Sequence, residues 1–431
     1  MSSENSLPPV MADSGRPASG RQKIFDALRI RNFRWYWIST LSFFSALQLQ
    51  SIAQAWLAYE ITHSPLKLGL VSAAFGVPNC IFSPLGGIIG DRIGRRRVII
   101  SAQAVSGTVI LVIATLITTG LVQYWHLLIA ALINGTAFAF IMPCQQALVP
   151  EMVPREKLYN AIALNSGAMN ITRVAGPALA GALIGFIGTG GVYYFALGFY
   201  LIAAASIFMI SERLRVNVSA GKSALAELME GINYMRSHTV ILLVLLMDFA
   251  VTLLGMPYHS LMPVFAELLE VQALGYGFLM TMVGIGALLG SLSIASLGHF
   301  RSKGKLLLVS GILFGLILTL FANSPFYGQV LGMGQKTFYL ASFLLMLIGA
   351  ASSCYTSTSS TLIQINITDE IRGRVLGIYG IVFGLMPIGA LMAGAVAEAI
   401  GAPSAITAGG TILAVFMLIM TLANRRVKRL E

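Results

Sequence analysis

The chain has 431 residues, of which 56% are hydrophobic and only 10% are charged. Its mean hydropathy is +0.80. Because soluble globular domains carry about 25% charged residues, this composition excludes an ordinary soluble protein and predicts an all-α polytopic membrane protein. At about 20 apolar residues for each crossing, plus a short turn, the length allows about a dozen membrane-spanning helices.

The net charge of +11 and the cysteine and histidine content exclude further classes. The polar termini lack the interleaved aromatic and basic residues of a nucleic-acid module, so we attribute the charge to membrane topology and to attraction by anionic lipid head groups. The three cysteines lie far apart in apolar runs, and the five histidines lack ligand spacing. We therefore expect no nucleic-acid partner, no metal and no cofactor.

A polar N-terminal tail, residues 1–31, precedes the apolar part of the chain and has no apolar core ahead of a small-residue cleavage site. We therefore expect no cleaved signal peptide, so the first span would direct the chain to the membrane. Twelve apolar stretches follow the tail, each long enough to be read as a span. Their approximate bounds are 33–60, 68–89, 98–120, 126–148, 161–187, 191–210, 239–265, 275–297, 306–323, 337–362, 375–399 and 403–423.

A polar linker, residues 211–238, divides these spans into two six-helix halves at 32–210 and 239–424, and a short tail follows at 425–431. The apolar residues of the linker recur at helical spacing, which predicts an amphipathic helix on the membrane surface.

The basic residues predict the orientation. An even number of spans puts both termini on one side of the membrane, and all but three of the 28 basic residues fall in termini or loops on that side. The exceptions are Lys67, Lys336 and Arg173. Because loops rich in arginine and lysine stay in the cytoplasm, both termini are predicted to be cytoplasmic, in the plasma membrane or the inner membrane of a Gram-negative cell.

The two halves repeat each other in sequence. Residues 90–98 align with 298–306, a basic turn after the second span of each half, and residues 148–156 align with 362–370. Duplicated six-span halves in parallel orientation are the architecture of one large class of secondary transporters, in which the substrate path lies between the halves.

The loop between the second and third spans, GGIIGDRIGRRR at 86–97, concentrates charge between two apolar runs. It resembles the signature loop of the major facilitator superfamily, and the matching positions are Gly87, Asp91, Arg92, Gly94, Arg95 and Arg96. The resemblance covers nearly the whole chain. It implies the twelve-helix fold of that superfamily, with two pseudo-symmetric six-helix halves.

We expect this loop to act as a conformational latch. Gly87 and Gly90 have no side chains, so the second span can approach its partner closely across the interface between the halves. Asp91 would interact with the N-terminus of the eleventh span, near Arg374, where the helix dipole favours negative charge. The arginines add hydrogen-bond donors, and the latch would break as the halves rock. The alternative is a positive-inside anchor, which leaves Asp91 and the glycines unexplained.

A second segment, RVAGPALAGALIG at 173–185, is similar to the Gly-Pro motif that exporters of this superfamily carry in the fifth span. Thr172 and Ala180 occupy positions where that pattern prefers glycine. The runs around the first and fourth spans resemble the branch of enterobactin-type siderophore exporters and macrolide exporters, which are drug:proton antiporters. The resemblance implies a small-molecule substrate, protons as the coupling ion and a monomer that functions alone. The matching motif positions are Arg173, Gly176, Pro177 and Gly181.

Two ionisable residues, Arg173 and Asp248, lie deep within predicted spans, each about 14 Å along its helix at 1.5 Å per residue. Such groups are costly in a bilayer and indicate function by default. Asp248 is the leading proton-coupling candidate, and the alternative is a structural carboxylate bonded to neighbouring hydroxyl or basic groups. For Arg173, which belongs to the Gly-Pro motif, we expect a role in helix packing rather than contact with the substrate. Whether the two residues pair stays open at this point.

One departure from the superfamily bears on proton coupling. The fourth-span pattern Arg-x-x-Gln-Gly, which is implicated in proton transfer, aligns here on Gly135. The arginine position is then Ala131 and the glutamine position is Asn134. Coupling by that route is therefore absent.

The resemblance implies that the first, fourth, seventh and tenth spans line the substrate path. The tenth span contains an unusually hydroxyl-rich run, SSCYTSTSST at 352–361. Amides, hydroxyls and aromatic rings suit a bulky amphipathic substrate, although Ser and Thr also bond their own helix backbone. The candidates for the path are Gln48, Gln50, Gln54, Asn134, Tyr258, His259, Tyr355 and Ser359.

We therefore expect a secondary active transporter that exports a drug, macrolide or siderophore by alternating access. A lipid or lysolipid translocator, or an uptake facilitator on the same fold, is the alternative. No Walker loop occurs, which disfavours ATP-driven pumping. A membrane-embedded enzyme is a remote alternative, because the sequence has no HExxH pair and no GxSxG elbow. A non-transporting sensor would be expected to lose the Asp91 latch.

Overall fold

The computed structural model describes residues 25–210, 238–296, 302–367 and 371–423. Most of the tail at 1–31, nearly all of the linker at 211–238 with its expected amphipathic helix, and the tail at 425–431 lie outside the described residues. Within the described residues the regular structure is entirely helical. The prediction of an all-α protein is confirmed for this part of the chain.

The N-terminal helices, α1–α5, follow one another with very short connections. They comprise η1 (Asp26–Arg29), α1 (Arg31–Thr62), α2 (Pro65–Ile93), α3 (Arg95–Thr118), α4 (Tyr124–Met152) and α5 (Arg155–Phe208). α5 joins the two predicted spans 161–187 and 191–210, and it turns at Gly188. Gly188 has a φ of 69° and a ψ of 171°, a backbone conformation that glycine adopts without steric cost.

The C-terminal helices, α7–α15, are more interrupted. They comprise α7 (Thr239–Ala250), η2 (Val251–Gly255), α8 (Tyr258–Leu268), α9 (Ala273–Ser296), α10 (Lys303–Ala322), α11 (Ser324–Val330), α12 (Lys336–Ile365), α13 (Arg372–Gly384), α14 (Met386–Ile400) and α15 (Ala402–Ala423). The predicted span 239–265 is broken by η2, a π-helical turn, and by Pro257. Such turns are usually single-turn bulges inside α-helices and are frequently found at functional sites.

Ten stretches of the described helices are long and apolar enough to cross a membrane, with the 54-residue α5 counted once. α1 is not among them, because several glutamines and serines lower its hydropathy. The prediction of a polytopic membrane protein agrees with these stretches.

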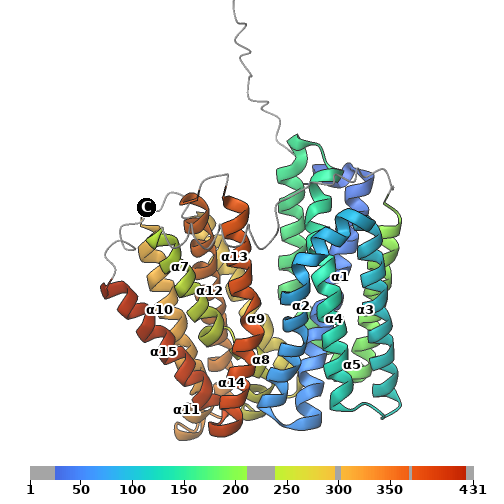
Figure 1. The fold of residues 1–431 in the computed structure, drawn as a ribbon. Coiled ribbons are helices and arrows are strands. Elements are labelled where there is room, and N and C mark those ends of the chain that lie inside the picture. The colour runs from blue at the N-terminus through green and yellow to red at the C-terminus, as the bar shows by residue number, and fades with distance from the viewer. Residues whose placement is uncertain (1–24, 211–237, 297–301, 368–370, 424–431) are drawn as a thin grey trace, which may run out of the picture.

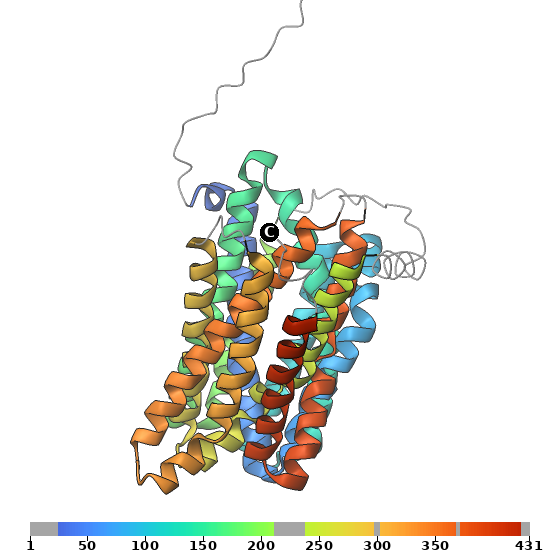
Figure 2. The same ribbon diagram turned by 90° about the vertical axis from the view of Figure 1, so that its left-hand side faces the viewer.

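The helices pack into two groups (Figure 1). Within the N-terminal helices, α1 packs on α5 and α2 packs on α4, and within the C-terminal helices, α9 packs on α12 and α10 packs on α15. The two groups meet mainly through α2 with α14 and through α5 with α9. Figure 2, which faces the C-terminal helices, shows that most helices run along the same long axis.

Turns between consecutive helices distinguish the two ends of the molecule. The His63 end, at the bottom of Figure 1, contains the turn between α1 and α2. The Gly94 end, at the top, contains the turn between α2 and α3. The two groups of helices converge at the His63 end and diverge towards the Gly94 end (Figure 1).

Candidate functional site

Polar side chains join the two groups at the His63 end. A Glu398 oxygen of α14 accepts hydrogen bonds from Ser64 Oγ at 2.7 Å and from the Leu66 backbone N–H at 3.2 Å. Glu267 of α8 accepts a hydrogen bond from the Tyr59 hydroxyl and lies 3.7 Å from His63 Nδ1. Two carboxylates of the C-terminal helices therefore hold the α1–α2 turn of the N-terminal helices.

Glycines allow close backbone contact just inside these bonds. A Cβ atom on Gly69 of α2 would lie 2.7 Å from the Ala390 carbonyl oxygen of α14. A Cβ on Gly76 would overlap the ring of Pro387. Between Gly69 and Gly76 on α2, Ser72 places its hydroxyl oxygen 3.0 Å from that of Ser260 on α8. Any side chain at Gly69 or Gly76 would force the two groups apart.

The Gly-Pro motif of α5 packs against α1 and α9. A Cβ on Gly176 would meet the Gln48 side chain of α1 at 2.6 Å. A Cβ on Gly181 would lie 2.7 Å from the Cα of Gly277 on α9, and a Cβ on Gly277 would lie 2.6 Å from the Pro177 carbonyl oxygen. These three motif residues therefore let α5 sit between a helix of each group.

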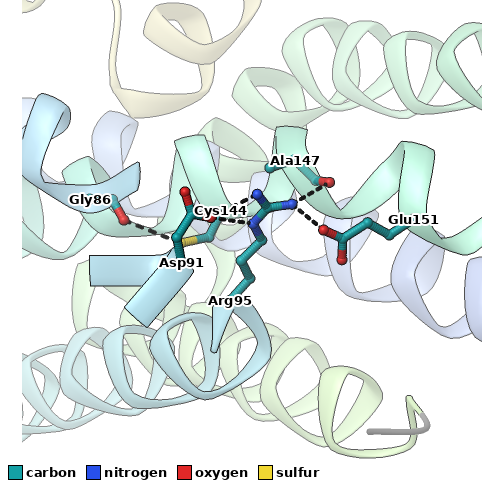
Figure 3. Close-up of polar contacts among 6 residues, drawn as sticks. All are labelled: Gly86, Asp91, Arg95, Cys144, Ala147 and Glu151. Carbon is teal, nitrogen blue, oxygen red and sulfur yellow. Dashed lines mark hydrogen bonds and ion pairs between the residues drawn. The ribbon is translucent and has the colours of Figure 1, made fainter. Parts of the chain in front are cut away.

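The charged loop at the Gly94 end is bonded within the N-terminal helices (Figure 3). The Arg95 guanidinium donates to Asp91 Oδ1 from Nη2 at 2.7 Å and from Nε at 3.0 Å. It also donates to the Ala147 carbonyl oxygen at 3.0 Å and forms an ion pair with Glu151. Arg96 donates to the Phe208 carbonyl oxygen of α5 at 2.6 Å. The loop thus ties α2, α3, α4 and α5 together.

The motif glycines have different surroundings in this loop. Gly94, with a φ of 104°, forms the turn between α2 and α3. A Cβ on Gly90 would contact Cys144 of α4 at 2.5 Å, and Cys144 Sγ itself donates to the Gly86 carbonyl oxygen (Figure 3). Gly87 has no atom within 4 Å of its Cβ position. The close approach of α2 to the C-terminal helices thus lies at Gly69 and Gly76 and not at Gly87 or Gly90, and a latch across the groups at the loop stays a prediction.

Arg95 is expected to matter for stability. Arg95→Ala removes the donors to Asp91, Ala147 and Glu151 and leaves two carboxylates facing each other, so we expect the free energy of unfolding to fall by about 1–2 kcal/mol. The measurement is the Tm of the purified protein in detergent. Arg92→Ala is the matched control for stability, because the Arg92 side chain is exposed. Equal Tm values for the two variants would contradict the tie between α2, α3 and α4.

Asp248 is fully buried on α7, and the π-helical turn begins three residues later, at Val251. Ser359 Oγ of α12 donates to its Oδ2 at 2.7 Å, whereas its Oδ1 has no hydrogen-bond partner among the described residues. The Tyr355 hydroxyl is the next polar group that interacts with the Asp248 carboxylate, although neither it nor Thr252 Oγ1 makes a well-formed hydrogen bond within that set. A buried carboxylate with one unsatisfied oxygen therefore faces a second helix across the C-terminal group.

The other candidates for the substrate path fall into two sets. Gln50 accepts from the Tyr200 hydroxyl at 2.9 Å, and Gln54 donates to the Leu127 carbonyl at 3.1 Å, so both amides are bonded inside the N-terminal helices. Of these candidates, only Gln48 and His259 are partly exposed. The buried candidates are Gln50, Gln54, Asn134, Tyr258, Tyr355 and Ser359.

The hydroxyl-rich run of α12 bonds mainly to its own helix. Thr356, Thr358 and Thr361 each donate to the carbonyl four residues earlier. Ser359 differs, because its hydroxyl reaches Asp248 on α7. Cys354 Sγ also donates to the Gly290 carbonyl oxygen of α9 at 3.4 Å, so the run contributes single interhelical bonds rather than a continuous polar wall.

The side chain of Arg173 is exposed, and the packing role that we expect from the Gly-Pro motif stays a prediction. Asn170 and Ser166, one and two turns before Arg173 on α5, are exposed as well. Arg173 interacts electrostatically with Tyr258 and His259 of α8. No ion pair joins it to Asp248 within the described part of the chain, which answers whether these two residues pair in this conformation.

Sequence reasoning missed several of these residues. Glu267 and Glu398 lie at helix ends, and their bonds to the α1–α2 turn have no sequence signature. Ser166 and Asn170 did have a signal, since with Arg173 they form a polar stripe at i, i+4 and i+7.

Comparisons with known proteins agree with this geometry. Residues 23–430 match the family model described as transmembrane secretion effector, MFS_3. The macrolide efflux protein A of Streptococcus pyogenes is 22% identical, covering 86% of this chain and 90% of that protein. The staphyloferrin A transporter of Staphylococcus aureus is 22% identical, covering 92% and 97%. The enterobactin exporter EntS of Shigella boydii is 24% identical, covering 92% and 93%.

Solved structures share the fold. A variant of the nucleoside transporter NupG superposes with a TM-score of 0.73 at 13% identity, covering 90% of this chain and 99% of that chain. A D-xylose-proton symporter superposes with a TM-score of 0.68 at 14% identity, covering 89% and 96%. The chain is thus a multi-pass membrane protein, and it belongs to the transmembrane secretion effector family of the major facilitator superfamily, whose members are transporters.

Proposed function

We propose that this protein exports a small amphipathic molecule in exchange for protons by alternating access. Efflux and export in the names of the macrolide and enterobactin relatives support the direction. The observation that carries proton coupling is Asp248, a fully buried carboxylate whose Oδ1 has no partner among the described residues. Ionised, such a group lacks sufficient compensation, whereas a proton on Oδ1 removes its charge.

The proposed topology has twelve membrane-spanning helices in two pseudo-symmetric six-helix halves. Counting α5 as two spans that meet at Gly188 supports six spans in the N-terminal helices. Counting α7 with α8 and α13 with α14 as single broken spans supports six in the C-terminal helices. Both termini would be cytoplasmic and the protein would function as a monomer in the plasma membrane.

The proposed state is closed on the outside. If the termini are cytoplasmic, the His63 end is extracellular, and the bonds of Glu267 and Glu398 close that side. The path would then be accessible from the cytoplasm, where an exporter loads its substrate. In the opposite state the Gly94 ends would meet, and the Asp91 loop would act as the latch there.

Proton transfer in this proposal uses the C-terminal helices. The fourth-span arginine and glutamine of the superfamily are replaced by Ala131 and Asn134. The π-helical turn that follows Asp248 provides a point at which α7 and α8 can move relative to each other. Protonation of Asp248 would then change its bond with Ser359 and the packing of α7 on α12.

Uptake into inverted membrane vesicles tests the function. A panel of macrolides, siderophores, cationic dyes and lysolipids is offered with and without an imposed pH gradient, acid inside. We expect at least one macrolide, siderophore or dye to accumulate only with the gradient and only in vesicles that contain the protein. Movement of lysolipids alone, independent of the gradient, would contradict the proposal and favour a lipid translocator.

A further inference from the structure

The position of Arg173 places a permanent positive charge near the middle of the membrane. It lies 18 residues from Arg155 at the start of α5 and 15 residues before Gly188. At 1.5 Å per residue these separations correspond to about 27 Å and 22 Å of helix. An arginine at this depth carries a large desolvation cost unless it is paired or faces water.

Contacts of α5 determine where this side chain points. On one flank of Arg173, Gly176 packs against Gln48 of α1. On the other flank, the backbone of Arg173 and Val174 packs against Gly284 of α9, whose Cβ would lie 3.0 Å from the Val174 Cα and 3.2 Å from the Arg173 carbonyl oxygen. The exposed stripe therefore opens between α1 and α9, towards α8, and not towards the lipid.

Charge balance at this face is incomplete. Arg173 forms no ion pair with any described carboxylate, and its guanidinium donates no hydrogen bond to a described residue. Its electrostatic neighbours are Tyr258 and His259, and neither a tyrosine hydroxyl nor an imidazole supplies a negative charge. Asp248, the one described carboxylate at similar depth, is bonded to Ser359 instead.

We propose that Arg173, flanked by the partly exposed Gln48 and His259, binds the oxyanion of an amphipathic carboxylate substrate. The planar guanidinium can donate two parallel hydrogen bonds to a carboxylate, and the Gln48 amide and a His259 N–H can add neutral donors. This inference rests on the proposed transport function, whose substrate it narrows to organic anions. The apolar part of the substrate would contact the α5, α8 and α9 surfaces around the stripe.

A binding experiment without any gradient tests this assignment separately from proton coupling. The probes are 11-(dansylamino)undecanoic acid and its methyl ester, which differ only in the carboxylate, and binding to the purified protein is followed by dansyl fluorescence. We expect the acid to bind at least tenfold more tightly than the ester. Arg173→Gln should remove this preference and leave the affinity for the ester unchanged.

The controls make the outcome specific. Arg155→Gln changes an exposed arginine at the start of the same helix and should keep the preference for the acid. Arg173→Lys, with its charge but without the planar fork, should retain part of the preference, and its Tm checks folding if Arg173→Gln is unstable. Equal binding of acid and ester to the wild type would overturn the proposal. Binding of lysophosphatidylglycerol without binding of the dansyl acid would overturn the assignment to a carboxylate substrate.

Discussion

Asp248→Asn is expected to abolish accumulation driven by a pH gradient while the protein stays folded. The amide has nearly the same shape, and its carbonyl oxygen can still accept the 2.7 Å hydrogen bond from Ser359 Oγ. It has no ionisable proton, so one of the two charge states of the transport cycle is lost. The initial rate of uptake into inverted vesicles should fall at least tenfold, to the level of vesicles without the protein.

Two further measurements separate coupling from folding. Exchange of labelled for unlabelled substrate without a gradient should persist in Asp248→Asn, because this exchange needs alternating access but no net proton movement. Glu60→Gln is the matched control, since Glu60 is an exposed acid at the end of α1. Gradient-driven uptake that survives in Asp248→Asn would show that another group carries the proton.

Gly76→Val is expected to prevent closure of the His63 end. A Cβ on Gly76 overlaps the Pro387 ring, and valine adds two methyl groups to that overlap. α2 and α14 must then separate, so transport should fall at least tenfold. Gly198→Val is the control, because nothing lies within 4 Å of the Gly198 Cβ position.

Cross-linking reports this closure directly. Ser72 and Ser260 hold their oxygens 3.0 Å apart across α2 and α8, so cysteines at both positions should form a disulfide when the His63 end is closed. The three native cysteines are changed to alanine in this background. The cross-link should form readily in this double-cysteine protein, both without a glycine substitution and with Gly198→Val. It should be largely lost when Gly76→Val is added. Unchanged cross-linking in Gly76→Val would contradict the tight contact of α2 with α14.

Composition and hydrophobic length predicted the fold class. A chain with 10% charged residues has too few polar side chains to cover its apolar residues in water, so these residues lie in a bilayer. The superfamily was also predicted from the sequence, since the Asp91 loop has a specific spacing. The breaks inside spans were not predicted. The π-helical turn at Val251–Gly255 has no sequence signature, because tertiary packing against α15 and α14 stabilises it.

The site was predicted less well than the fold, for reasons that differ between residues. Gln48, Gln50 and Gln54 are equivalent in sequence, but Gln50 and Gln54 face Tyr200 and the Leu127 carbonyl, whereas Gln48 stays half-exposed. The spacing of these amides does not show which of them point towards a neighbouring helix, because that depends on where the other helices pack. Arg173 was assigned to packing because it adjoins the Gly-Pro motif, although the stripe it forms with Ser166 and Asn170 was visible in the sequence.

The latch illustrates a different limit. A sequence contains the contacts of every state in the transport cycle, while one structure contains those of a single state. Here Asp91 is bonded to Arg95 of α3, whereas its predicted partner is the N-terminus of the eleventh span. The same loop can therefore tie α2, α3 and α4 together in one state and contact the eleventh span in another.

Proton movement coupled to substrate movement tests the central claim most directly. Purified protein is reconstituted into liposomes that contain a pH-sensitive dye, and a transported substrate from the vesicle panel is added outside with no initial gradient. An antiporter must move protons out as the substrate enters, so we predict that the lumen becomes more alkaline in proportion to the substrate taken up, and that Asp248→Asn gives no pH change. Substrate entry with a constant luminal pH in the wild type would contradict proton-coupled export.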